Sequence, residues 1–395
     1  MIIAGGIFFY IYPMQVQFGI DNFLKSPPGY KRVPIALVTN NAATTSAGVP
    51  TRIALVKNGF NLRKLFSPEH GISATGADGT LQDNAIDPVT GLPVISLYGH
   101  RISPSEEDLA DIDICIFDIP DAGSRFYTYL WTMTYVMEAC AKFNKSFLVL
   151  DRPNPIGADL SKAEGPMLDE ENCSSFIGRW SIPVKHGCTL GELALYFAAV
   201  KIKDLELKII QAGNYDRKST TNNFLFIPPS PAIEDPATAM LYPGIGLLEG
   251  VNVNEGRGTG KPFRICGAPW INSYELQGAL LEKHLPGVTI IPAVYKAAAT
   301  PYKDETCYGI ELQVTDADKF CSVNTGIELL RSIQQLYPLQ FKERLYTTHV
   351  NPTGRFHLDK LLGVQNAFVK LQRGNAFEIE VANQWKTEMN SFLLY

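Results

Sequence analysis

The chain contains few cysteines, and their positions match no known disulfide or metal-binding pattern. The 395 residues include seven cysteines, with no CxxC pair and no Cys/His group at the spacing of a zinc site. An odd, scattered set excludes a disulfide framework and a structural zinc site. The sequence therefore predicts no metal and no cofactor.

An excess of basic charge is also missing. Lys and Arg total 35 against 40 Asp and Glu, which gives a formal net charge of −5. This balance indicates no general attraction to nucleic acid or to an anionic membrane. Hydrophobic residues make up 46% and charged residues 19%, which is ordinary globular composition and excludes a largely disordered chain.

Four common catalytic signatures are absent. The chain has no GxGxxG after its first predicted strand, no GxxxxGK[ST], no HExxH and no GxSxG. Nicotinamide redox chemistry, P-loop phosphoryl transfer, zinc-dependent proteolysis and α/β-hydrolase acyl transfer are therefore disfavoured. The side chains that remain as candidates for catalysis are carboxylates, Arg, Tyr and His.

Long hydrophobic runs are limited to the beginning of the chain. Residues 2–12 are almost wholly apolar, and no charged side chain precedes Asp21. The run is too short to span a bilayer as a helix. It fits the hydrophobic part of a secretory signal, although a basic n-region and a clear cleavage site are missing; the alternative is a strand or helix of the fold. We treat residues 1–16 as an apolar leader and expect a periplasmic or secreted protein.

The pattern that is present in the first half is an alternation of strands and helices. Strands are predicted at 35–39, 62–66, 92–97, 112–119, 147–150 and 205–210, with helices between several of them, such as 51–58, 129–141 and 189–199. Such alternation predicts an α/β domain with a Rossmann-like parallel sheet over residues 17–230. Prolines crowd residues 226–243, so a boundary is placed near Ser230. Residues 231–395 look like a smaller α+β domain.

Polar loops follow four of the predicted strands. In a parallel sheet these loops meet at one edge, where ligands bind. They carry the first group of candidate site residues: Asn40, Asn41, Glu69, His70, Asp121, Arg125, Tyr127, Tyr129 and Asp151. Glu69 is either a catalytic carboxylate or a surface-turn glutamate. Asp121, Arg125 and Asp151 have structural alternatives as turn or ion-pair residues, and the tyrosines can pack on the next helix instead of stacking on a ligand. His186, just before a predicted helix, is a further candidate.

A second group of candidates lies in the Gly-rich segment 242–260. It presents Glu249, Asn252, Glu255 and Arg257 among glycines that let backbone approach a ligand. A solvated connection is the alternative. Facing the loops of the first domain, the segment would form an interdomain cleft with carboxylates on both walls. Such a pair suits glycoside hydrolysis, in which one carboxyl group protonates the leaving oxygen and the other attacks, stabilises or activates water.

Several motifs in fixed order resemble one family. They are SPEHG at 67–71, FDIPDAGSRFYTY at 117–129, DRPNP at 151–155, HGCTLGE at 186–192, and Glu249-Gly250 followed by GRGT at 256–259. Together they resemble the exo-β-N-acetylmuramidases of the NamZ type, over nearly the whole chain. The short leader and Cys188, where a larger apolar residue is expected, are departures.

This resemblance implies a two-domain secreted or periplasmic glycoside hydrolase with its active site between the domains. It would release N-acetylmuramic acid from the non-reducing ends of peptidoglycan-derived saccharides during cell-wall recycling. The catalytic glutamate of the family falls on Glu69, which we expect to act as the acid with help from His70. Glu249 or Glu255, or the acetamido group of the substrate, would act opposite. Arg125 or Arg257 would pair with the substrate carboxylate. A non-catalytic muropeptide-binding protein is the alternative, and an esterase or amidase a weaker one.

Overall fold

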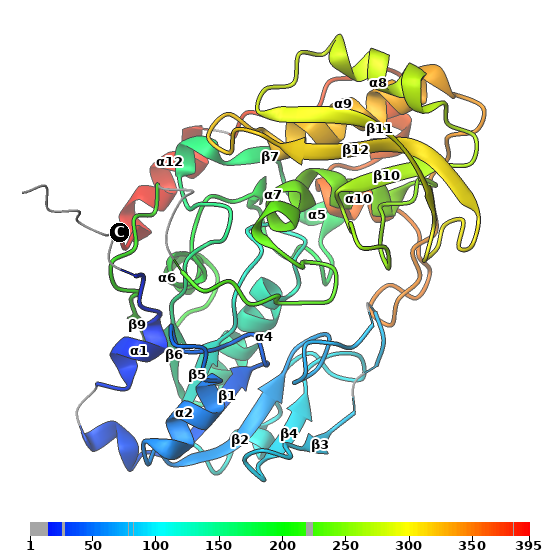
Figure 1. Cartoon of the computed structure of the whole chain (residues 1–395). Helices are drawn as coiled ribbons and strands as arrows, with labels where there is room; N and C mark the ends of the chain where they lie inside the picture. The colour runs from blue at the N-terminus through cyan, green and yellow to red at the C-terminus, as the bar shows by residue number, and fades with distance from the viewer. Residues whose placement is uncertain (1–14, 26–27, 78, 82, 219–223, 382) are drawn as a thin grey trace, which may run out of the picture.

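The computed structural model describes residues 15–25, 28–77, 79–81, 83–218, 224–381 and 383–395. Most of the predicted leader, residues 1–14, lies outside them. None of the helices in the described part of the chain is both long and apolar enough to cross a bilayer. Figure 1 shows the sheet of the first half, in blue and cyan, below the yellow and orange part of the second half.

The first half is built on a seven-stranded sheet in the order β3-β4-β2-β1-β5-β6-β9. Every neighbouring pair is parallel except β3 with β4. The strands are β1 (Ile35–Thr39), β2 (Leu62–Ser67), β3 (Ala85–Ile86), β4 (Pro93–Ser96), β5 (Ile114–Asp118), β6 (Ser146–Leu150) and β9 (Leu207–Ile210). The parallel strands run outward from β1 on one side and from β5 on the other. This is the Rossmann-like order, with its topological switch between β1 and β5.

Helices cover both faces of this sheet, as the alternating pattern predicts. All five residues of β1 are buried, and its side chains alternate between two apolar clusters. One cluster includes α4 (Tyr129–Lys142) and α6 (Leu190–Val200), and the other includes α1 (Gly19–Phe23) and α2 (Thr51–Lys57). Shorter pieces complete this half: α3 (Glu106–Leu109), α5 (Glu170–Cys173) and the antiparallel pair β7 (Glu164–Met167) and β8 (Pro183–Lys185).

The second half contains a three-stranded antiparallel sheet in the order β10-β12-β11. Its strands are β10 (Ile265–Ala268), β11 (Val288–Lys296) and β12 (Thr306–Val314). Its helices include α7 (Pro236–Ile245), α8 (Ser273–Leu281), α9 (Ser322–Leu336), α10 (His357–Leu362) and α11 (Ala367–Gln372). The α+β character predicted for this half is present in Figure 1.

Helix α7 was not predicted, because its prolines and glycines read as a connection. The helix nevertheless begins well, since the Asp235 side chain accepts a hydrogen bond from Thr238 N at 2.7 Å and Pro236 occupies the first turn. Gly244 lets α7 cross α9 closely: a Cβ there would lie 1.9 Å from Ser322 O. The glycine therefore serves helix packing rather than ligand approach.

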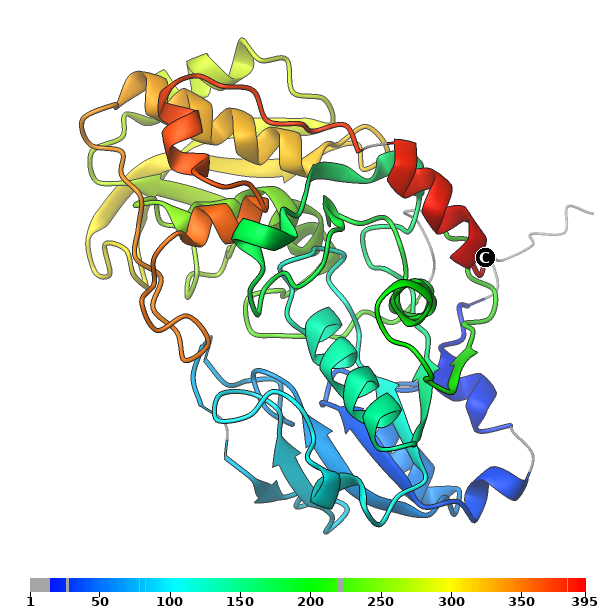
Figure 2. The same cartoon turned by 180° about the vertical axis from the view of Figure 1, so that it is seen from behind.

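The end of the chain returns to the first half. Helix α12 (Asn383–Met389) lies beside α6 and β7, as both views show (Figures 1 and 2). Trp385 Nε1 donates to His186 O at 3.4 Å, and the Tyr395 hydroxyl donates to Asp151 Oδ2 at 2.8 Å. Residues 383–395 therefore complete the core of the first half although they follow the second in sequence.

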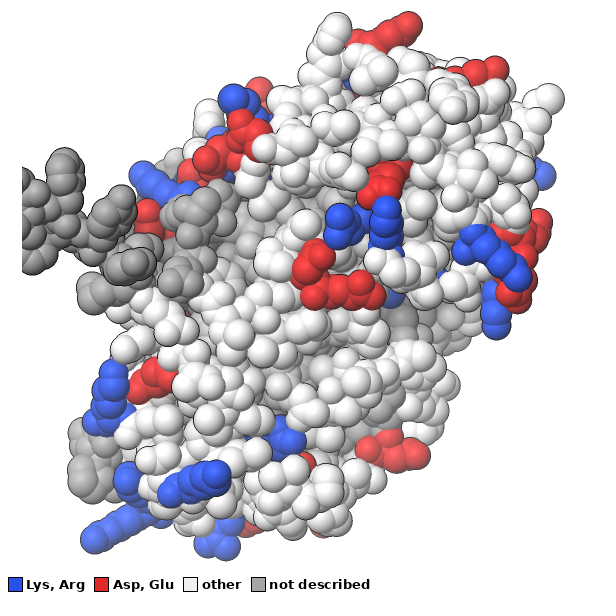
Figure 3. Space-filling model, viewed as in Figure 1, with Lys and Arg blue, Asp and Glu red and all other residues white. Residues whose placement is uncertain are grey.

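Charged side chains are mixed on the surface. On the face seen in Figure 3, basic and acidic residues lie interspersed rather than gathered by sign. Several form ion pairs, including Lys261 with Glu311 at 2.6 Å and Arg264 with Asp235 at 3.3 Å.

Candidate active site

A pocket of about 750 Å³, partly open to solvent, lies between the two halves. The first half lines it with the loops that follow β2 and β5, near the switch point of the sheet. The second half lines it with the segment 242–263, residues 346–351 and α10. The polar and charged residues among its lining are Glu69, His70, Tyr98, Tyr127, Thr128, Ser175, Ser230, Tyr242, Glu249, Arg257, Tyr346, Thr348, Asn351, His357 and Lys360.

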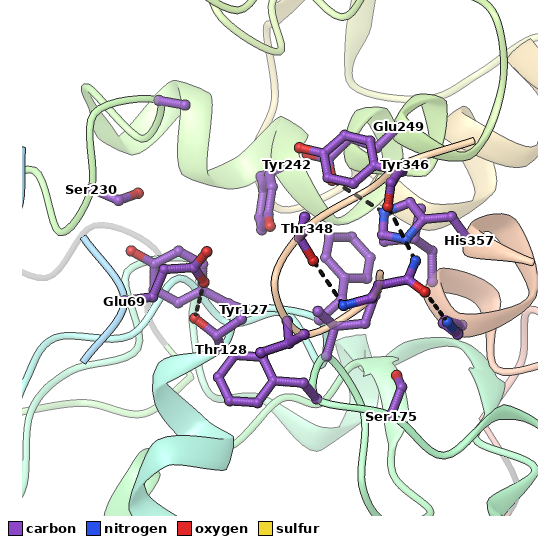
Figure 4. Close-up of a pocket in the computed structure, with 18 of the residues that line it drawn as sticks. Glu69, Tyr127, Thr128, Ser175, Ser230, Tyr242, Glu249, Tyr346, Thr348 and His357 are labelled. Carbon is purple, nitrogen blue, oxygen red and sulfur yellow. Dashed lines mark hydrogen bonds and ion pairs between the residues drawn. The ribbon is translucent and has the colours of Figure 1, made fainter. Parts of the chain in front are cut away.

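Glu69 occupies the wall formed by the first half (Figure 4). Its carboxylate accepts hydrogen bonds from Thr128 Oγ1 at 2.8 Å and from Gly79 N at 3.0 Å. The residue is only 6% exposed, so it is not the solvated turn glutamate that the sequence also allowed. A carboxyl group fixed by two donors at the edge of a pocket is placed for proton transfer.

His70 lies beside Glu69 in the same pocket lining. Its backbone has a left-handed φ of 67°, and its ring Nδ1 donates to Gly76 O at 2.7 Å. Because a carbonyl oxygen only accepts, Nδ1 carries the hydrogen, and Nε2 is the acceptor in the neutral ring. Through this bond His70 also fixes the loop that carries Glu69.

Two of the predicted aromatic residues pack next to this wall. Tyr127 lines the pocket, and its ring meets that of Tyr129 edge-on at 4.8 Å. Tyr129 itself lies behind the wall, where its hydroxyl donates to Pro229 O at 2.8 Å and accepts from Asn40 Nδ2 at 3.2 Å. Burial, with the nearby Glu69 charge, raises the pKa of Tyr129 above its ordinary value. Asn40 and Tyr129 therefore support the wall without lining the pocket.

The opposite wall holds an ionic cluster centred on Arg257. Its Nη2 lies 2.5 Å from Glu249 Oε1, and its Nε lies 3.3 Å from Glu255 Oε1. Glu249 lines the pocket, whereas Glu255 is fully buried behind it and also faces Arg344 Nη1 at 3.7 Å. Burial raises the pKa of Glu255 to about 7, with Arg257 opposing the shift. Glu249 thus faces the pocket, and Glu255 contacts Arg257 from the buried side.

The six pocket-lining residues between positions 346 and 360 were not predicted. The His357 ring stacks on Tyr346, with centroids 4.4 Å apart and planes 8° from parallel. His357 Nε2 lies 3.6 Å from Glu249 Oε2, and Lys360 Nζ donates to Asn351 Oδ1 at 2.7 Å. These residues are about 100 positions beyond the Gly-rich segment and follow no motif that the sequence analysis used. Their spacing of three, His357 to Lys360, was the one available signal that they share a helix face.

Arg125 is not brought to the pocket. It is fully buried, and its guanidinium donates to the carbonyl oxygens of Pro166, Ile182 and Leu361, each at 2.8 Å. Burial lowers its pKa to about 9. Because Nη1 and Nη2 donate to backbone oxygens from both halves of the chain, Arg125 joins the halves, and it does not line the pocket.

Asp121 and His186 also lie away from the pocket, as a buried pair. His186 Nε2 is 3.1 Å from Asp121 Oδ2, and His186 Nδ1 accepts from Cys188 N at 3.2 Å. Cys188 is itself fully buried and tolerated there. The pair connects the loop after β5 to the start of α6.

Asp151, Asn252 and Asn41 complete the set outside the pocket. Asp151 accepts from Thr189 Oγ1 at 2.7 Å and Gly191 N at 2.8 Å, and burial raises its pKa to about 6. Asn252 donates to Gln340 O at 2.9 Å and accepts from Lys342 N at 2.7 Å. Asn41 is exposed on its loop. The first two therefore join segments of backbone, and only Glu69, His70, Tyr127, Glu249 and Arg257 of the predicted residues line the pocket.

No metal site accompanies this pocket in the part of the chain that the structure describes. Across these residues no group of three or more His, Cys, Asp or Glu is placed to hold a metal ion.

The comparisons with known proteins agree with this architecture. The family model described as exo-β-N-acetylmuramidase NamZ, N-terminal, matches residues 35–237, and its C-terminal counterpart matches residues 240–394. The peptidoglycan β-N-acetylmuramidase NamZ of Bacillus subtilis is 39% identical over 96% of this chain and 89% of its own length.

Two solved structures from Bacteroides fragilis have the same fold. Both are described as DUF1343 family proteins. One is 29% identical with a TM-score of 0.85, covering 96% of this chain and 99% of its own. The other is 27% identical with a TM-score of 0.74, covering 97% and 99%. The chain therefore belongs to the exo-β-N-acetylmuramidase NamZ family of glycoside hydrolases.

Proposed function

We propose that this protein hydrolyses the glycosidic bond of a terminal N-acetylmuramic acid at the non-reducing end of peptidoglycan fragments. The observation that carries the proposal is Glu69, a buried carboxyl group held by Thr128 and Gly79 in a pocket whose opposite wall presents Glu249. Two carboxyl groups on facing walls are the machinery that most glycosidases use. The activity named for the B. subtilis relative supports the same reading.

In this mechanism Glu69 supplies the proton. The bond between the anomeric carbon and the glycosidic oxygen breaks, and the proton of the Glu69 carboxyl group passes to that oxygen as the next sugar leaves. His70 holds the loop that carries Glu69 through its bond to Gly76 O. The two donors on the carboxylate keep its orientation fixed while the proton moves.

A second group must stabilise or neutralise the positive charge that develops at the anomeric carbon. Glu249 lies between Arg257 and His357, so its ionised form suits attack on that carbon, its electrostatic stabilisation, or activation of a water molecule. The acetamido group of the substrate is the alternative nucleophile, in which case Glu249 acts on charge alone. Glu255 acts indirectly, by sharing Arg257 with Glu249.

We further propose that the protein works in the periplasm or after secretion, in the recycling of cell-wall fragments. Peptidoglycan lies outside the inner membrane, and the apolar residues 2–12 support export. Cell fractionation with a cytosolic marker enzyme checks this point. Recovery of the active protein with the cytosolic marker would contradict it.

The test of the activity is incubation of the purified protein with the disaccharide MurNAc–GlcNAc, read by mass spectrometry, with EDTA in a parallel tube. We expect free N-acetylmuramic acid in both tubes. Intact disaccharide in both, with the sugar bound to the protein, would instead indicate a receptor. Product only in the tube without EDTA would show that a metal is needed.

A further inference from the structure

The pocket contains a cation whose role the mechanism above leaves open. The proposed substrate differs from an N-acetylglucosamine glycoside by a lactyl ether on C3 that ends in a carboxylate. The two arginines that the sequence suggested as its partner are both engaged. Arg125 donates to three backbone carbonyls, and Arg257 is bound between Glu249 and Glu255.

Lys360 is different, because its ammonium group meets a neutral partner. It lines the pocket from α10, and Nζ donates to the amide oxygen of Asn351 at 2.7 Å. In the described part of the chain it forms no ion pair with a carboxylate. The adjacent Asp359 uses its oxygens to accept from Asn366 N and Ala367 N at 2.7 and 2.8 Å. Partial burial accordingly lowers the pKa of Lys360, so an arriving anion would offset that desolvation.

Asn351 holds the ammonium group in place. Its Nδ2 donates to Tyr346 O at 3.1 Å, and its backbone N donates to Thr348 Oγ1 at 3.0 Å. Because Asn351 is held through both its side-chain Nδ2 and its backbone N, its Oδ1 stays directed at Lys360 Nζ. A lysine whose position is fixed in advance loses less conformational freedom when it binds an anion.

His357 offers a further donor one helical turn earlier. It is 4% exposed, and neither of its ring nitrogens has a hydrogen-bond partner among the described residues. Nε2 lies 3.6 Å from Glu249 Oε2, within ion-pair range, so Nδ1 is the ring nitrogen placed to meet a group that the protein does not itself supply. Its stacking on Tyr346 fixes the plane of the ring.

The location also suits the geometry of the sugar. Figure 4 shows Glu69 and His357 on opposite sides of the pocket. The bond to be broken is at C1 of the pyranose and the lactyl ether is at C3, so the acid and the carboxylate-binding group must stand apart. Lys360 belongs to the same helix as His357, three residues further along α10.

We propose that Lys360 binds the lactyl carboxylate of the substrate, assisted by His357, and thereby selects muramic acid over glucosamine glycosides. The assignment rests on the proposed function. It makes α10, rather than either predicted arginine, the element that determines specificity.

The test compares a charged and an uncharged substrate on matched variants. Aryl β-N-acetylmuraminide and the same compound with its lactyl group as a neutral amide are assayed with the wild-type chain, Lys360→Met and Lys360→Arg. We expect the wild type to prefer the acid by roughly 10- to 100-fold in kcat/KM. Lys360→Met should reduce this preference to about threefold or less, by lowering kcat/KM on the acid much more than on the amide, and Lys360→Arg should restore most of it. Lys342→Met, at an exposed lysine outside the pocket lining, is the control.

An unchanged ratio of kcat/KM on the acid to kcat/KM on the amide in folded Lys360→Met would overturn the role of Lys360. It would not contradict the proposed hydrolase activity. If the wild type cleaves neither compound, the proposed activity is wrong. The role of Lys360 is then tested by measuring binding. In that case calorimetry with methyl β-N-acetylmuraminide and methyl β-N-acetylglucosaminide is run on the same variants. Equal discrimination by the wild type and Lys360→Met would again exclude Lys360.

Discussion

Thr128 donates a hydrogen bond from Oγ1 to Glu69 Oε2 at 2.8 Å, across loops that leave two different strands of the sheet. Glu69 follows β2, whereas Thr128 immediately precedes α4, in the segment after β5. The two strands flank β1, so the bond spans the first strand near the switch point of the fold. The orientation of the candidate acid is thus set by the order of strands and not by its own loop alone.

Replacing Glu69 by Gln is expected to lower kcat by about 10²–10⁴-fold, the contribution of a general acid. The amide has the same shape but cannot deliver a proton; its oxygen can accept from Gly79 N while its Nε2 donates to the Thr128 hydroxyl. Release of N-acetylmuramic acid and a thermal melt are measured together. Glu282→Gln, at an exposed glutamate, serves as the control. A folded Glu69→Gln protein with near-normal turnover would remove Glu69 from this role.

Replacing Thr128 by Val is expected to lower kcat about 10- to 150-fold, with a smaller effect on KM. The change keeps the shape of the side chain and removes a donor to Glu69, and a hydrogen bond to a charged group contributes about 1.5–3 kcal/mol. Thr128→Ser retains the hydroxyl and should recover most of the activity. Equal kinetics for the Val and Ser variants would show that the bond does not matter for turnover.

The buried Glu255 predicts a dependence of stability on pH. Its pKa is raised to about 7 from an ordinary value of 4.5, so its favourable contribution is complete below pH 4.5 and is lost as pH rises to about 7. A shift of this size corresponds to on the order of 3 kcal/mol of unfolding free energy. Glu255→Gln imitates the protonated group. We therefore expect the wild type to lose stability relative to this variant between pH 5 and 8, as measured by thermal melts. Parallel curves would contradict the prediction.

Replacing Arg125 by Met is expected to destabilise the protein by about 3–5 kcal/mol without raising KM. The substitution leaves three buried carbonyl oxygens without their donor and removes a contact between the two halves of the chain. Denaturant titration and kinetics at a permissive temperature separate the two effects. Arg373→Met, at an exposed position, is the control. A normally stable variant with a strongly raised KM would return Arg125 to substrate binding.

The sheet of the first half could be predicted because its strands are short, buried and separated by helical patterns. The predicted strand at 35–39 matches β1, and the helix predicted at 189–199 corresponds to α6, which begins at a capping box of Thr189 and Glu192. Glu69 could be selected because a carboxylate in a tight loop after a parallel strand is placed at the ligand-binding edge. Local residue order was sufficient for these features.

Roles that depend on distant partners could not be predicted in this way. Arg125 and Arg257 are both arginines in polar, Gly-containing segments, yet one donates to backbone carbonyls and the other lines the pocket. Helix α7 was missed because its cap and its contact with α9 outweigh the unfavourable prolines and glycines. Lys360 and His357 were missed because no local pattern distinguishes them from surface residues.

The sequence by itself determined the α/β class, the family and the loop that carries Glu69, because strand periodicity and short motifs are local properties of the chain. Only the tertiary structure decided which polar side chains meet in one pocket. That outcome depends on burial and on hydrogen-bond partners far apart in sequence, such as Leu361 O, 236 positions from Arg125. A buried donor or charge is satisfied by whatever the fold brings beside it, and no local pattern records that partner.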